Sequence, residues 1–203
     1  MRFRKSILLL CVLFAATASI QAEELEMGVV KYQYFSKLSN QLEDGVLRVI
    51  YDDQADGFIL FLAKASGTVK IRITPADVDK LRANLEKYVE WEKLAVANQV
   101  ELKKPLPNSG IAGPAEWDEK SVKYSAPAVA LSFDFLSRTK MLHLLQIGAN
   151  SVKSTDGSAT LALDIMYLDK PAAFAFENVI AAKNVAAKRK ASADQKAVQG
   201  LFQ

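Results

Sequence analysis

Hydrophobic and polar residues alternate with a period of two over the first third of the chain, which is typical of β-strands that bury one face. Strands are predicted over residues 27–35, 45–51 and 68–74, and the continuously apolar run 57–63 indicates a strand buried on both faces. Short segments with turn-forming residues separate them: Asp44-Gly45, Asp56-Gly57 and Ser66-Gly67. The pattern therefore predicts an antiparallel meander.

The period changes to three and four residues after the last of these strands, which predicts a helix. Thr74 is in position to cap the helix, Pro75 occupies its first turn and Asp77 follows. Apolar residues then recur on one face up to residue 98, beginning with Val78, Leu81, Leu85, Tyr88 and Val89. We expect this amphipathic helix to cover one face of the meander.

The pattern breaks over residues 104–117, where three prolines and two glycines predict a long loop or a boundary. Alternation returns over residues 128–135, 141–147 and 158–168, with Asp156-Gly157 as a hairpin turn. A second helix is predicted from Asp169, with Pro171 in its first turn. The residues expected to face inward on that helix are Phe174, Val179, Ile180 and Ala182.

This order of elements predicts an α+β fold, in which antiparallel meander sheets pack against two long amphipathic helices. Residues 23–103 and 118–203 each read as strands followed by a helix, which suggests two similar β-meander-plus-helix halves, within one compact domain or apart. The shared order does not by itself establish a duplication. An eight-stranded outer-membrane barrel is the alternative, and both helical segments count against it.

Residues 1–22 have the pattern of a secretory signal peptide. Arg2, Arg4 and Lys5 precede an apolar run over residues 7–16, and small residues allow cleavage after Ala18 or Ala22. The run is too short for an ordinary membrane span, so an uncleaved anchor is the less favoured interpretation. We therefore expect a periplasmic or secreted protein with no transmembrane span after cleavage.

Removal of residues 1–22 changes both the charge and the cysteine content. The 203-residue chain has 26 basic and 23 acidic residues, and residues 1–22 contain three of the basic ones and none of the acidic ones. A mature chain of balanced charge has no strong field that draws it to nucleic acid. Cys11 is the only cysteine, and Leu10 before it excludes a lipid-attachment site. A mature chain without cysteine is typical of the bacterial envelope rather than of small disulfide-rich domains.

His143 is the only histidine, so any Ser-His-Asp chemistry must use it. If Arg138-Thr139 forms a two-residue hairpin turn, Asp134 lies opposite His143 on one sheet face, with Ser132 beside it and Asp164 on the polar side of another strand. Ser132 has no nucleophile-elbow pattern around it. We therefore expect Asp134 and His143 to form a partly exposed cross-strand contact, and we keep His143, Asp134 and Ser132 as catalytic candidates without a supporting motif.

Three further groups of residues suggest binding chemistry. Asp52, Asp53 and Asp56 resemble a calcium loop, but Ala63 stands where an EF-hand needs a carboxylate, so an acidic hairpin turn is the better interpretation. Trp117 is either an exposed partner-binding anchor or a residue that closes the core. Basic residues near the C-terminus either contact an anionic surface or keep the segment solvated: Lys183, Lys188, Arg189, Lys190 and Lys196.

The chain has no Walker loop, dinucleotide-binding glycine pattern, HExxH or CxxC, so we expect no cofactor and no metal. Export and the scarcity of catalytic residues favour a non-catalytic envelope protein that binds or scaffolds an unknown envelope component or small ligand. One alternative is a periplasmic hydrolase that uses His143 and Asp134. Another is a carrier of a lipid or another hydrophobic ligand.

Overall fold

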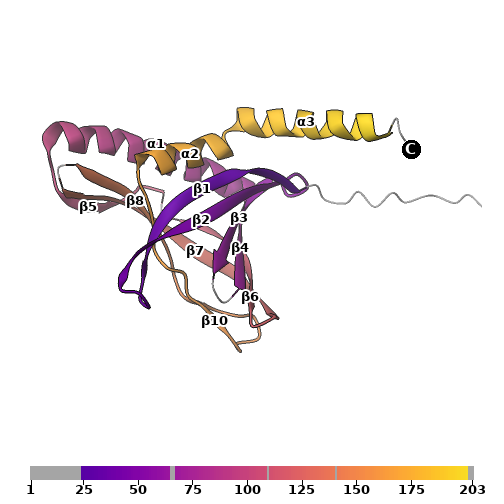
Figure 1. Ribbon diagram of the computed structural model, residues 1–203, viewed down its shortest axis with the longest axis horizontal. Coiled ribbons are helices and arrows are strands. Elements are labelled where there is room, and N and C mark those ends of the chain that lie inside the picture. Colours follow the sequence, from indigo (N-terminus) through magenta and orange to yellow (C-terminus); the bar gives the residue numbers. More distant parts are fainter. Residues whose placement is uncertain (1–23, 65–66, 109, 140, 201–203) are drawn as a thin grey trace, which may run out of the picture.

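The computed structural model describes residues 24–64, 67–108, 110–139 and 141–200, and the predicted signal peptide lies outside them. The fold is predominantly β and its main feature is a closed antiparallel barrel of eight strands (Figure 1). The strands follow one another around the barrel in chain order: β1 (Glu24–Ser36), β2 (Gln41–Asp52), β3 (Gly57–Lys64), β4 (Gly67–Ile73), β6 (Ile111–Glu119), β7 (Val122–Thr139), β8 (Leu142–Ala149) and β11 (Met166–Leu168).

The expectation of open meander sheets against two long helices is therefore wrong. Closure depends on β11, which is only three residues long and pairs with β1 on one side and β8 on the other. Tyr34 lies opposite Met166, and Leu168 lies opposite Leu145. The two supposed halves are thus successive parts of one meander, and α1 (Pro75–Asn98) is an insertion between β4 and β6.

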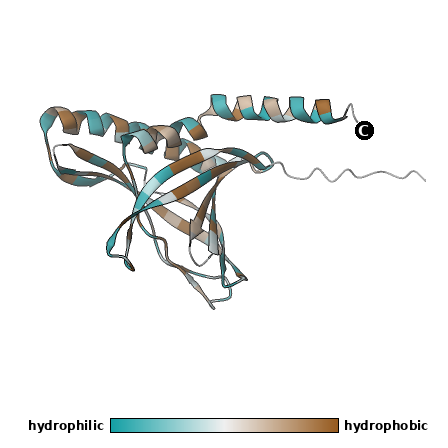
Figure 2. Cartoon of the chain, viewed as in Figure 1, coloured by the Kyte–Doolittle hydropathy of each residue, from teal (hydrophilic) through white to brown (hydrophobic). Residues whose placement is uncertain are grey.

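Apolar side chains fill the barrel. On β4, Val69, Ile71 and Ile73 are 1–2% exposed, and the inward residues of the other strands join them in one continuous core cluster. Figure 2 shows hydrophobic and hydrophilic residues alternating along the strands, as expected when every second side chain points inward. A barrel of eight strands can either be filled by its own side chains or hold one small ligand, and here buried side chains form a continuous core.

Helices α1 and α2 (Lys170–Ile180) lie side by side at the end of the barrel where β4 and β11 terminate (Figure 1). The predicted start of α1 at Pro75 and its end at Asn98 are confirmed. The start of α2 is also confirmed, because the Asp169 side chain caps it by accepting from the Ala172 amide at 2.9 Å. An ion pair between Lys170 and buried Glu92 joins the two helices at 2.7 Å.

The second helical segment is not one helix. Ala181 is extended, so the chain breaks between α2 and α3 (Ala182–Gly200). The residues of α2 that face the core are Ala173, Phe176 and Ile180, and the expectation that Phe174 faces inward is wrong, since it is 36% exposed. No helix in the described ranges is both long and apolar enough to span a membrane.

The segment 104–117 is mostly strand rather than loop. It contains the end of β5 (Leu102–Pro105), which pairs with β7, and most of β6. Gly113 is required there because a Cβ would lie 1.7 Å from the Arg72 carbonyl oxygen. A register shift between Gly113 and Ala115 accommodates Pro114, which lacks an amide hydrogen for the ladder.

Two other local expectations are also corrected. Asp44-Gly45 lies within β2, and the turn falls at residues 37–40. Gly45 is a packing requirement instead, because the Tyr32 ring covers it so closely that a Cβ would meet the ring at 2.3 Å. The expected strand 158–168 is reduced to β10 (Thr160–Leu161), which forms a small hairpin with β9 (Val152–Lys153), and to β11. The predicted turn lies in that small hairpin, where Gly157 has a φ of 72°.

Candidate functional site

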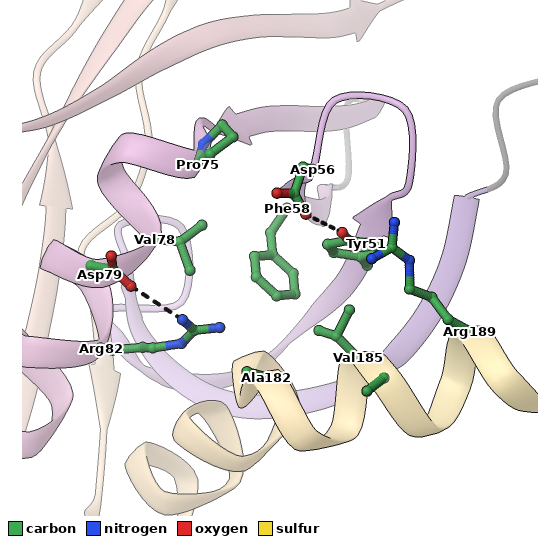
Figure 3. A pocket seen from close by; sticks show the side chains of 11 residues that line it. Tyr51, Asp56, Phe58, Pro75, Val78, Asp79, Arg82, Ala182, Val185 and Arg189 are labelled. Atoms are coloured by element: carbon green, nitrogen blue, oxygen red, sulfur yellow. Dashed lines mark hydrogen bonds and ion pairs between the residues drawn. The ribbon is translucent and has the colours of Figure 1, made fainter.

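A concave site lies where the β2–β3 turn, the first turns of α1 and the first half of α3 meet (Figure 3). We call it the α1–α3 groove; its volume is about 660 Å³. Three apolar side chains form its floor, and they are almost fully buried: Phe58 at 2%, Val78 at 6% and Val185 at 8% exposed. The other lining residues are Tyr51, Asp56, Pro75, Asp79, Arg82, Ala182, Ala186 and Arg189.

Arg82 is held in place by the end of α2. Its Nε and Nη2 donate to the carbonyl oxygen of Ile180 at 3.2 and 2.7 Å, and its Nη1 donates to Asp79 at 3.2 Å. The last carbonyls of a helix have no partner within the helix, so a guanidinium is a suitable donor for Ile180. Arg82 thus fixes α1 to α2 and presents a positioned guanidinium at one side of the groove.

Arg189, on α3, is also held in place by neighbouring side chains. It donates to Asp53, and its guanidinium carbon lies 5.4 Å from the centre of the Tyr51 ring. The Tyr51 hydroxyl donates to Asp56, and burial together with this hydrogen bond raises the pKa of Tyr51 to about 12. The groove rim therefore carries two guanidinium groups, Arg82 and Arg189, and two carboxylates, Asp56 and Asp79.

The three aspartates beside the groove form an acidic hairpin turn, as the sequence predicted. Asp52 accepts from the amides of Gln54 and Ala55 at 3.1 Å and from Arg72 at 2.7 Å. Since Asp53 and Asp56 bind Arg189 and Tyr51, each carboxylate has its own partner. Among the described residues, no group of three or more acidic, histidine or cysteine side chains is placed to hold a metal ion.

The three catalytic candidates are not brought together. His143 lies opposite Ser137 and Asp134 lies opposite Gln146, so the expected pairing of Asp134 with His143 is wrong. Thr139 still belongs to β7 and pairs with Leu142, so the turn lies beyond Arg138-Thr139, and a register shift between Ser137 and Thr139 displaces the pairing by one further residue. Asp134 contacts Lys103 and Gln146 on the outer face, and Ser132 is exposed on the same strand.

His143 belongs to the packing between the barrel and α1. It is 7% exposed, its ring is parallel to Phe135 within 9°, and its Nδ1 lies 3.1 Å from the Ser137 hydroxyl. Tyr88 donates to the His143 carbonyl oxygen at 2.9 Å. Within the described part of the chain, His143 Nε2 has no hydrogen-bond partner. These contacts are those of a structural residue at the end of the core.

Trp117 lies inside the barrel rather than on its surface. It is 4% exposed and stacks on Tyr124, with ring centres 5.6 Å apart. Its indole nitrogen is buried and has no acceptor among the residues that the structure describes. Of the two interpretations offered by the sequence, the geometry therefore favours a residue of the core.

The basic residues of α3 do not share one face. Arg189 turns toward the barrel, Lys188 lies near Glu26, and Lys190 is exposed. The helix as a whole carries five basic residues and one acidic residue, whereas residues 24–181 carry 18 basic and 21 acidic residues. Positive charge is therefore concentrated on the helix that borders the groove and projects from the body (Figure 1).

Sequence reasoning did not find the groove. Tyr51 and Phe58 lie in predicted strands and Arg82 lies in a predicted helix, and nothing in the sequence distinguishes them from their neighbours. Val185 offered one signal, as a branched aliphatic residue in a stretch composed mainly of alanine and lysine. A comparison with protein-family models, curated proteins and solved structures finds no match for this chain. Function must therefore be argued from the geometry alone.

Proposed function

We propose that this protein is a non-catalytic binding module of the bacterial envelope, which docks an extended segment of a partner protein in the α1–α3 groove. One observation carries the proposal: a buried apolar floor of Phe58, Val78 and Val185 is bordered by charged groups of both signs. An apolar centre within a polar rim is the arrangement found at protein interfaces.

The residue types of the rim suit a peptide better than a single small ion. Tyrosine and arginine are enriched among the residues that dominate binding energy, and the groove contains Tyr51, Arg82 and Arg189. Arg82 and Arg189 offer further N–H donors to carbonyl or carboxylate oxygens. Asp56 and Asp79 offer acceptors to amides or basic side chains. In a segment with one apolar side chain between charged ones, the apolar side chain can pack on the floor of the groove and the charged ones can pair with the arginines and aspartates of the rim.

The other two functions considered from the sequence receive less support. A hydrolase built on His143 and Asp134 would need both side chains at one site, whereas their strand positions separate them. A carrier with its cargo inside the barrel would need space that inward side chains such as Leu60, Phe133 and Leu145 occupy. Export remains a prediction from residues 1–22, as does contact of Lys188, Arg189 and Lys190 with an anionic surface.

Selection of peptides on the purified protein tests the proposal. A phage-displayed library of random short peptides is panned against the wild type, and each enriched peptide is titrated against two pairs of variants. Val185→Asp puts a charge on the groove floor, and Val198→Asp is its control on the same helix at a position 54% exposed. Asp79→Lys reverses a rim charge, and Glu86→Lys is its exposed control on α1.

We expect enriched peptides to carry an apolar residue with charged neighbours. Their affinity should fall by about tenfold or more with Val185→Asp, because a charge cannot be buried there without a partner, and stay unchanged with Val198→Asp. Asp79→Lys should lower the affinity for the peptides less than Val185→Asp does. The proposal is wrong if no peptide is enriched, or if enriched peptides bind Val185→Asp as tightly as the wild type.

A further inference from the structure

We infer that a second groove, between the last turns of α1 and β5, binds a small molecule that combines an apolar chain or ring with one carboxylate. Figure 1 shows these two elements at the end of the molecule away from α3. We call the site the α1–β5 groove; its volume is about 230 Å³, and its apolar lining residues are Trp91, Leu94, Ala95, Val100, Leu102 and Phe135. This inference is independent of the function proposed for the α1–α3 groove.

The floor of the α1–β5 groove is held by packed aromatic rings. Phe135 is 1% exposed, and the Trp91 ring meets it edge-on with ring centres 6.0 Å apart. The rings of Tyr88 and His143 also pack against Phe135, at 5.9 and 6.3 Å. Because these contacts already fix the floor, a ligand meets a preformed surface and little ordering of side chains opposes its binding.

The rim of the α1–β5 groove is fixed where the chain leaves α1. The amides of Gln99 and Val100 donate to the Ala95 carbonyl oxygen, and the Ser137 hydroxyl donates to the Val100 carbonyl oxygen at 2.5 Å. Three apolar residues nevertheless remain open to solvent around the groove: Leu94 at 52%, Val100 at 38% and Leu102 at 37% exposed. Exposed apolar side chains gathered around a concavity mark a binding site.

Lys104 is the one charged residue that lines the α1–β5 groove. Its ammonium lies 4.7 Å from the centre of the Trp91 ring. Within the described part of the chain, no carboxylate is close enough to form an ion pair with Lys104. A ligand whose apolar part lies on Trp91 and Leu94 can therefore place a carboxylate beside an ammonium that has no acidic partner.

The other charges near the groove are compensated or lie outside its lining. Lys87 is bound to Glu90 at 2.7 Å, and Lys103 is bound to Asp134 at 3.3 Å. Glu101 is exposed and does not line the groove. Lys104 therefore determines the sign of the charge that a ligand meets there, and that sign favours an anion.

The size of the groove favours a small molecule over a peptide strand. An apolar cavity of about 150 Å³ holds a benzene ring, and pockets for drug-sized ligands begin at roughly 300 Å³. The α1–β5 groove lies between these sizes and suits one ring or a short alkyl chain. A strand could add only at the free edge of β5, where Pro105 lacks an amide hydrogen and Lys103 and Lys104 are typical of protected edges.

Titration of the full protein with octanoate tests the inference through its own fluorescence. Trp91 lines the groove, whereas Trp117 lies inside the barrel and is 4% exposed, so a bound alkyl chain should change the emission of Trp91 alone. We expect a saturable blue shift at submillimolar octanoate. Octan-1-ol should bind more weakly and octylammonium most weakly, because the first lacks the charge and the second carries the wrong one. Equilibrium dialysis with labelled octanoate provides a readout that does not depend on tryptophan.

Two matched pairs of variants locate the site. Leu94→Asp should lower the affinity for octanoate by about tenfold or more, since it puts a negative charge on the apolar wall, whereas Val96→Asp, 50% exposed on the same helix but outside the groove, should not change it. Lys104→Met keeps an apolar stem without the charge and should lower the affinity for octanoate by about three- to fivefold. Lys103→Met is its control, because Lys103 contacts Asp134 instead of lining the groove.

Three results would overturn the inference. The first is that octanoate neither shifts the emission nor is retained in dialysis. The second is that Leu94→Asp or Lys104→Met binds octanoate as tightly as its control. The third is that sedimentation shows a dimer that Leu94→Asp dissociates while octanoate leaves the wild type unchanged, because a second copy of the chain would then be the occupant of the groove.

Discussion

Truncation of Val185 tests directly how α3 is held against the barrel. From Ala186 to Gln199 the helix is exposed apart from Ser192, which is half-buried, and Val185 is the one buried residue between residues 182 and 199. A helix of this length without tertiary contacts is only marginally stable in water. The burial of Val185, together with the contacts of Arg189 with the Tyr51 ring and with Asp53, should therefore determine what fraction of the time α3 is docked and the groove is formed.

The magnitude follows from a matched pair of substitutions. Val185→Ala removes the equivalent of two buried methylene groups, which is about 1.6 kcal/mol of transfer free energy. Val198→Ala is the same change on the same helix at a position 54% exposed. Both variants gain the same helix propensity, so that contribution cancels in the comparison. The difference between them should be about 1.5 kcal/mol, or roughly tenfold in the docking equilibrium.

Hydrogen exchange measured by mass spectrometry provides the assay. Peptides covering residues 186–199 should exchange roughly ten times faster in Val185→Ala than in Val198→Ala, while peptides from α1 serve as an internal reference. Arg189→Ala should also accelerate exchange over these residues. Equal protection of α3 in the two valine variants would refute the reasoning, because it would mean that Val185 does not hold the helix.

Three further predictions concern stability. Gly113→Ala should lower the free energy of unfolding in urea by about 3 kcal/mol, since β4 and β6 must separate to admit the Cβ. Gly110→Ala is the control: its Cβ meets nothing within 4 Å, so the free energy of unfolding should change by about 0.5 kcal/mol or less. Lys170→Ala should lower the free energy of unfolding by about 2 kcal/mol and Glu92→Gln by about 1 kcal/mol, because only the first leaves the buried Glu92 carboxylate unpaired. Equal losses of stability in the two variants would contradict this reasoning. Hydrogen bonds from Ser154 and Ser158 lower the pKa of Asp156 from 3.8 to about 2. These hydrogen bonds should therefore stabilise the β9–β10 turn fully above about pH 4, and the stabilisation should be lost as the pH falls through about 2. The amide shift of Ser158 should follow that titration, and Ser154→Ala should move the midpoint upward.

Local signals allowed most of the barrel strands and two helix starts to be predicted. The alternation of Val69, Ile71 and Ile73 gives the inward face of β4, since period two fixes which side chains share a face. Pro75 and Asp169 mark the beginnings of α1 and α2, because a proline in the first turn and a side-chain cap both depend on residues adjacent in the chain. Thr74 occupies the N-cap position of α1, but its side chain makes no capping hydrogen bond. Features that depend on residues close together in the chain could therefore be predicted from the sequence.

Closure and register were not accessible, because both depend on contacts between distant residues. The barrel closes through three residues of β11, too few to show a period, and they pair with β1 about 130 residues earlier in the chain. The turn between β7 and β8 lies beyond Thr139 rather than at Arg138-Thr139, which is why Asp134 does not pair with His143. The irregularity between Ser137 and Thr139 shifts the register by one more residue, and a shift of one residue moves side chains to the other face of a strand.

The candidate groove was hidden for the same reason. Its floor joins Phe58 on β3, Val78 on α1 and Val185 on α3, and its rim joins Arg82 to the end of α2. Each residue has an unremarkable role within its own element. The break at Ala181 is what turns the chain so that α3 borders the groove, and the surrounding sequence contains no proline or glycine that would signal a break.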